Sequence, residues 1–128
     1  AGINGWDALK NKEKGRTTLA DELNTVPATL PALMYAQKMQ KRAARKGAFA
    51  QTAEDAAAAL KAAECGWEEA VPENAAERAG ALLFAAANAM RLAGVDAEEA
   101  LTFASGRFRQ ELLQKTEDSD GQERPATV

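Results

Sequence analysis

Alanine constrains the fold of this chain more than any other residue, because it supplies 31 of the 128 residues. It is the strongest helix former and adds little side-chain bulk. Runs such as Ala56–Ala59 and Ala85–Ala87 bury their surface well only if helix backbones approach closely. Aromatic residues are only 5% of the chain and β-branched residues are sparse after Val26, so strand signals are nearly absent. The sequence therefore predicts an all-α bundle of about four to five helices, completed by dimerisation.

Composition excludes several classes of function. The net charge of −3 argues against general nucleic-acid binding, which needs a basic face. No apolar run approaches the ~20 residues needed to span a bilayer, and the N-terminus does not resemble a signal peptide. The single cysteine excludes an intrachain disulfide and fits a reducing compartment. We therefore expect a cytoplasmic protein with neither a nucleic-acid nor a membrane partner.

Histidine is absent from the chain. Its absence removes the commonest general base and the commonest transition-metal ligand together. Any catalytic chemistry would have to rely on carboxylates and cations.

Capping signals divide the chain into five helical pieces. Pro31 fits a first helical turn, and Gly47 and Gly94 fit the position just after a last one. Thr52 and Asp96 are N-cap candidates, and each is followed three residues later by an acid. The predicted helices cover residues 3–14, 31–46, 52 to a stop at Gly66, about 72–92 and 96–116, with one further turn at 19–23 inside a loop. Residues 1–117 would form a single domain, and residues 118–128 a disordered tail.

Large apolar side chains gather in the last two predicted helices. We expect them to supply most of the heavy core: Leu82, Leu83, Phe84, Met90, Leu101, Phe103, Phe108 and Leu112.

Four segments of the sequence carry motifs in a fixed order. The first is W-D-A-L-K-N-K-E-K (Trp6–Lys14), and the second is V-P-A-T-L-P-A-L-M-Y-A-Q-K-M-Q-K-R-A-A-R-K-G (Val26–Gly47). The third is A-G-A-L-L-F-A-A-A-N (Ala79–Asn88), and the fourth is Ala93–Phe108. Together they resemble the C-terminal domain of the MazG family of nucleoside triphosphate pyrophosphohydrolases. The first is similar to the segment that leads into that domain, and the second resembles its entry helix and is the most specific match. The third resembles G-D-L-L-F-A-x-x-N of that family, and the fourth resembles G-x-D-x-E-x-A-L-x-x-x-N-x-K-F.

The resemblance implies a dimeric, all-α domain that uses Mg²⁺ to split a nucleoside triphosphate into a monophosphate and pyrophosphate. The family holds its metal ions with an E-E-x-x-E motif on one helix and an E-x-x-D motif on the next. This spacing places the carboxylates of each motif on one helix face. Mg²⁺ prefers such oxygen ligands in near-octahedral geometry, and it can activate water while neutralising phosphate charge.

This chain departs from the family pattern at the carboxylates. Ala81 takes the place of the aspartate, and Arg78 takes the place of the glutamate three residues before it, although Glu77 survives beside it. The best alignment places the E-E-x-x-E motif near Lys61–Cys65, where only Glu64 is acidic. Losing most of these carboxylates should leave no preformed Mg²⁺ site.

Residual metal ligands would be Glu64, Glu73 and Glu77. Glu73 and Glu77 are four residues apart and could hold a divalent ion loosely. The alternative is that they are solvated acids of a first helical turn, where the helix dipole favours negative charge.

Four cations are candidates for binding a nucleotide through its phosphates: Lys38, Arg42, Arg45 and Arg107. The alternative for each of them is a solvated basic face.

Three functions stay open from the sequence. The first is a MazG-like domain whose catalytic site has degenerated and which acts as a dimeric scaffold or a nucleotide-responsive module. The second is an active but divergent pyrophosphohydrolase with a rearranged Mg²⁺ site. The third is a helical interaction module without a ligand. Mg²⁺ would be a cofactor only of the second, and a nucleoside triphosphate a ligand of the first two.

Overall fold

The computed structural model describes residues 17–50 and 52–123, and within these ranges the chain is all-α. The helices are α2 (Leu19–Asn24), α3 (Ala32–Arg45), α4 (Ala53–Glu68), α5 (Ala75–Leu92) and α6 (Ala97–Glu123). The all-α prediction is confirmed. The helix predicted at residues 3–14 lies outside the described residues.

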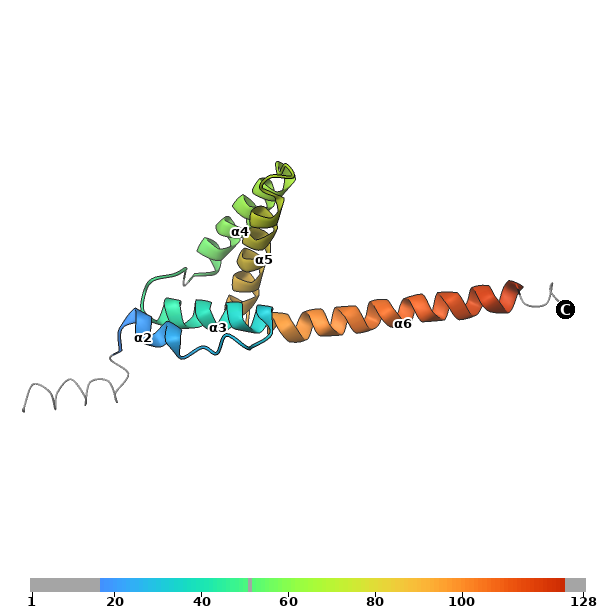
Figure 1. Cartoon of the computed structure of the whole chain (residues 1–128), viewed down its shortest axis with the longest axis horizontal. Coiled ribbons are helices and arrows are strands. Elements are labelled where there is room, and N and C mark those ends of the chain that lie inside the picture. The colour runs from blue at the N-terminus through green and yellow to red at the C-terminus, as the bar shows by residue number, and fades with distance from the viewer. Residues whose placement is uncertain (1–16, 51, 124–128) are drawn as a thin grey trace, which may run out of the picture.

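The helices form two short packed pairs, α2 with α3 and α4 with α5, and one long helix, α6 (Figure 1). α4 and α5 pack side by side as a helical hairpin, and α2 packs against α3. α3 also contacts α5 and the beginning of α6. Beyond that contact α6 extends away from the other helices (Figure 1). The single chain is therefore an open arrangement rather than a closed bundle.

Capping residues set most of the helix ends as predicted. The Thr52 Oγ1 accepts a hydrogen bond of 3.0 Å from the backbone N–H of Asp55, and the Asp96 Oδ1 accepts one of 3.1 Å from that of Glu99. Gly47 and Gly94 follow α3 and α5 with positive φ angles of 73° and 78°, which a glycine adopts without steric cost.

Two helix ends differ from the prediction. Gly66 does not stop α4, which continues to Glu68, because one glycine in a helix costs only about 1 kcal/mol relative to alanine. α6 continues past Thr116 to Glu123, since the next proline is Pro125. Residues 124–128 of the predicted tail lie outside the described residues.

The buried core of the single chain is small. Among the described residues, its apolar members are Val26, Ala56, Ala87 and Ala97. The predicted heavy core is wrong for one chain, because seven of its eight members are exposed, by 39% to 68%, and only Leu82 is half-buried. The cause is the open arrangement: within the described part of the chain, no helix covers most of α6, which carries four of the seven, or the exposed side of α5, which carries the other three.

None of the helices in the described part of the chain is both long and apolar enough to cross a membrane.

Candidate functional site: a buried carboxylate and a dispersed set of acids

Glu22 of α2 is a buried carboxylate that binds three side chains. Its Oε1 accepts a hydrogen bond of 2.9 Å from the Thr17 hydroxyl. Its Oε2 lies 3.5 Å from the Nη1 of Arg42 and 3.9 Å from the Nη1 of Arg45. Glu22 is only 7% exposed, and burial of a carboxylate is tolerated when it is paired in this way. The cluster therefore ties α2 to the C-terminal half of α3.

This pairing accounts for two of the four predicted phosphate-binding cations. Arg42 and Arg45 lie on the same face of α3, one turn apart, and both face Glu22. Arg42 is the closer of the two and can donate a hydrogen bond to the Glu22 carboxylate. Their positive charge is thus partly compensated within the chain. As nucleotide-binding residues they stay a prediction.

We expect the stability of the chain to fall in acid through Glu22. The Thr17 hydrogen bond, followed by the charges of Arg45 and Arg42, lowers the pKa of Glu22 below its usual 4.5, although burial opposes the shift. A lowered pKa in the folded state stabilises the fold above pH 4.5, and this stabilisation is lost as the pH falls through the folded pKa. Urea unfolding of the wild type and Glu22→Gln at several pH values checks this. The variant should be less stable at pH 7, and the difference should shrink in acid, whereas a constant difference would contradict the assignment.

The three glutamates predicted as residual metal ligands are exposed and lie at different places in the α4–α5 hairpin. Glu64 lies on α4, Glu73 precedes α5, and Glu77 lies in the first turn of α5. Among the described residues, no three histidines, cysteines, aspartates or glutamates come close enough together to hold a metal ion. Glu73 and Glu77 therefore have the surroundings of solvated acids near a helix N-terminus.

Arg78 is the most informative residue of the α4–α5 hairpin. Its Nη1 donates a hydrogen bond of 2.7 Å to the carbonyl oxygen of Gly66, in the last turn of α4. The Arg78 side chain also lies against the backbone there, because a Cβ added at Gly66 would be 4.0 Å from its Cδ. The last carbonyl groups of a helix lack partners within the helix, so Arg78 caps α4 from the neighbouring helix.

The residues of the hairpin do not fit a Mg²⁺ ion. A Mg²⁺ site needs several oxygen ligands at short distance, and a carboxylate cluster of that kind is missing from the described residues. The guanidinium of Arg78 adds a positive charge beside α4, which repels a divalent cation. Ala81, in the place of the family's aspartate, is exposed and offers no ligand.

The other two predicted cations lie apart from each other. Lys38 is exposed on α3, where it lines a groove next to the turn between α5 and α6. Arg107 lies about 15 Å along α6 from Ala97, and its Nη2 is 3.7 Å from the Oε1 of Glu111 one turn later. Exposed pairs of this kind contribute little to stability.

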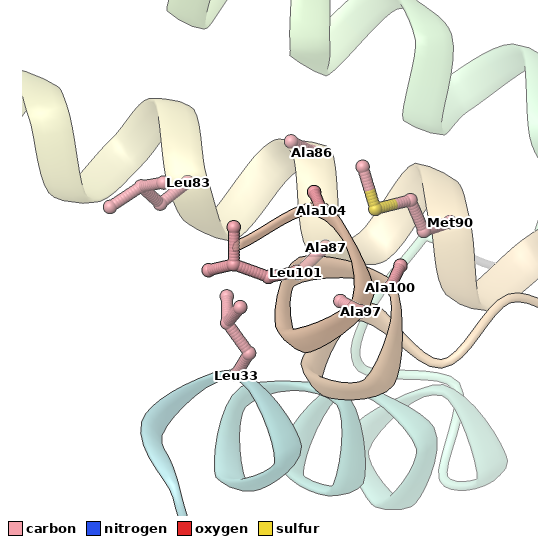
Figure 2. A pocket seen from close by; sticks show the side chains of 9 residues that line it. All are labelled: Leu33, Leu83, Ala86, Ala87, Met90, Ala97, Ala100, Leu101 and Ala104. Atoms are coloured by element: carbon pink, nitrogen blue, oxygen red, sulfur yellow. The ribbon is translucent and has the colours of Figure 1, made fainter. Parts of the chain in front are cut away.

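A second groove, lined by residues of α3, α5 and α6, is almost entirely apolar (Figure 2). It has a volume of about 280 Å³ and is lined by leucine, alanine and methionine side chains: Leu33, Leu83, Ala86, Ala87, Met90, Ala97, Ala100, Leu101 and Ala104. Leu83 and Leu101 stand at its rim and are 59% and 54% exposed. Such a groove can accept an apolar side chain but offers no polar group for orienting a substrate.

Sequence reasoning missed three polar residues that form bonds between elements of the fold. Glu22 could not be paired with Arg42 from the sequence, because they are twenty residues apart. Gln40 is only 1% exposed and donates a hydrogen bond of 2.9 Å to the carbonyl of Phe84. Gln37 bonds α5 and the start of α6. The two glutamines, three residues apart on α3, share one helix face, and that spacing was a detectable signal.

Glu68 is a further acid of α4. It follows Glu64 by four residues, so the two lie on one face of the helix. Both side chains are exposed, and no third acid or cysteine of the described residues comes close enough to complete a metal site with them.

Comparison with known proteins supports a MazG-like relationship. The chain is 33% identical over 109 residues to the nucleoside triphosphate pyrophosphohydrolase of Escherichia coli strain K12, covering 80% of this chain and 41% of that protein. The protein of the same name from Escherichia coli O157:H7 matches to the same extent. The chain thus spans less than half the length of these curated relatives. No family model matches the chain.

Proposed function

We propose that this chain is a MazG-like domain that has lost its divalent-metal centre and acts as a dimeric helical scaffold. The observation that carries the proposal is Arg78, whose guanidinium binds the Gly66 carbonyl from the place where the family has a metal-binding glutamate. The position that carries a metal ligand in the family is occupied here by Arg78, which caps α4. The α4–α5 hairpin, which would hold Mg²⁺ in the family, is therefore stabilised by a hydrogen bond between its two helices. Residues 1–117 would form the domain, and a cytoplasmic location fits the single cysteine.

Dimerisation follows from the apolar surface of α5 and α6. Ala97, Leu101, Ala104, Phe108 and Leu112 recur every three or four residues and form one stripe along α6. Residues 99–119 of this helix are all exposed in the single chain, although a helix of this composition needs packing to be stable in water. A second copy offers the same stripe and the same apolar groove, so one symmetric contact covers both.

The divergent-enzyme alternative needs Glu64, Glu73 and Glu77 to share a metal ion. The exposure of all three and the position of Arg78 argue against that arrangement in one chain. The chain could still respond to a nucleoside triphosphate through its cations without hydrolysing it.

Titration with Mn²⁺, followed by calorimetry, tests the loss of the metal centre. We expect no saturable binding by the wild type, because its carboxylates are dispersed. The double variant Arg78→Glu/Ala81→Asp restores the E-x-x-D motif and should gain Mn²⁺ binding, which shows that the assay detects such a site. Saturable binding by the wild type that disappears in Glu77→Gln would contradict the proposal and support a divergent enzyme.

A further inference from the structure

A cationic groove lies between α3 and the turn that joins α5 to α6. It has a volume of about 240 Å³, and its polar lining comes from Gln37, Lys38, Lys41, Arg91 and Asp96. Three of these five side chains are cations and one is an acid. The groove is therefore locally positive in a chain whose net charge is −3.

Two of the cations are unpaired lysines on one face of α3. Lys38 and Lys41 are three residues apart in the helix, so their side chains project from the same side. Both are exposed, and neither forms an ion pair or hydrogen bond with any part of the chain that the structure describes. Their ammonium groups are free to converge on a ligand.

The third cation, Arg91 of α5, is held in place but lacks an acidic partner. Its Nε donates a hydrogen bond of 2.9 Å to the Oδ1 of Asn88, and its Nη2 donates one of 3.0 Å to the carbonyl of Ala50. Both acceptors are neutral, and no carboxylate of the described residues forms a salt bridge with the half-buried guanidinium. Burial lowers the pKa of Arg91, as expected for a charge without a counter-ion. An anion in the groove would supply that counter-ion.

Hydrogen bonds fix the remaining polar lining of the groove. Gln37 is bound to the main chain at Ala87, Val95 and Ala97, so its position is set by three contacts. The Asp96 carboxylate accepts the N–H of Glu99 as the N-cap of α6. Its negative charge is thus directed to the helix N-terminus, where it is stabilised.

We propose that this groove binds the phosphate chain of a small di- or triphosphate anion. Phosphate groups match several converging cations, because charge-assisted hydrogen bonds to anions are the strongest that lysine and arginine make. The volume is below the ~300 Å³ of sites that enclose a drug-sized ligand, so it suits the phosphates rather than a whole nucleotide. The inference deepens the response to a nucleoside triphosphate named under the proposed function and rests on it for the class of ligand, but it needs neither a second copy nor a metal centre.

The groove is distinct from the lost metal centre. Arg78 and Arg91 lie on the same helix, thirteen residues apart, which separates them by about 20 Å along α5. Of the four cations predicted from the sequence, only Lys38 lines the groove, and Lys41 and Arg91 are newly assigned.

Calorimetric titration with inorganic triphosphate at fixed ionic strength tests the site. The wild type should bind with saturation, and Lys38→Gln/Lys41→Gln should weaken binding by at least about tenfold, because two charge-assisted contacts are lost. The matched control Lys61→Gln/Lys115→Gln removes two exposed lysines from α4 and α6 and should change the affinity by less than about twofold.

Three outcomes would overturn the proposal: no saturable binding by the wild type, unchanged binding by Lys38→Gln/Lys41→Gln, or equal weakening in both double variants. A parallel titration with ATP separates the two sources of the ligand. Equal affinity for ATP and triphosphate supports recognition of the phosphate chain alone, whereas tighter binding of ATP supports a nucleotide whose nucleoside adds contacts outside the groove. None of these results changes the expectation for Mn²⁺.

Discussion

The Leu101→Asp variant is expected to separate the proposed dimer into single chains. Leu101 lies at the rim of the apolar groove and is 54% exposed in one chain, so the substitution should be tolerated before association. In a symmetric dimer the same residue enters the interface twice, and each copy would bury an unpaired carboxylate. We expect the dissociation constant to rise by at least about a hundredfold, the effect of losing a central contact worth 2–3 kcal/mol.

Sedimentation velocity over a range of protein concentrations measures this effect. Val71→Asp is the matched control, because Val71 is a similarly exposed apolar residue, 49% accessible, at the far end of the α4–α5 hairpin. Circular dichroism at the same concentrations follows whether the separated chains keep their helices. A wild type that is monomeric at every concentration, or a Leu101→Asp variant that dimerises like Val71→Asp, would remove the argument for a second copy on this face.

The second large effect is expected for Gln37→Leu. The Gln37 side chain donates hydrogen bonds of 2.9 Å and 3.1 Å to the carbonyls of Ala87 and Val95, and its Oε1 accepts one of 3.0 Å from the N–H of Ala97. Ala97 begins α6 and is 4% exposed, so a leucine would leave its N–H without a partner in a buried place. We expect a loss of about 3 kcal/mol in the free energy of unfolding.

Gln40→Leu provides a matched control one turn along the same helix. No residue that the structure describes is more buried than Gln40, yet its side chain makes only one hydrogen bond there, and its Oε1 lacks a partner. Replacing it by leucine removes an unsatisfied buried acceptor, so the change should stay within about 1 kcal/mol. Urea unfolding of both variants at one protein concentration makes the comparison. Equal losses in the two variants would mean that packing, not the Ala97 N–H, sets the cost.

Local signals predicted the helices well. Thr52, Asp96, Gly47 and Gly94 act within three or four residues of a helix end, so their roles can be inferred without knowing the rest of the fold. Gly66 was misread because a glycine stops a helix only where the chain turns to a positive φ.

The core and the candidate site depend on contacts that the sequence hides. Phe103 and Phe108 were expected inside, because large apolar side chains are usually buried, but they are 68% and 63% exposed in one chain. Whether a helix of a second chain covers these two side chains depends on how the chains assemble. The Glu22 pair with Arg42 joins residues twenty positions apart, and the Arg78 cap depends on the register of α4 against α5. The sequence pattern alone determines neither the Glu22–Arg42 pair nor the Arg78 cap.

Release of pyrophosphate from a panel of nucleoside triphosphates, with Mg²⁺ or Mn²⁺ present, tests most directly whether the metal centre is lost. We predict no turnover of any nucleotide above the buffer rate, because Arg78 binds Gly66 where a metal ligand is needed and Ala81 offers none. Glu77→Ala is the control that separates a weak site of this chain from a contaminating enzyme. Turnover by the wild type that disappears in Glu77→Ala would contradict the account and establish an active enzyme with a rearranged site.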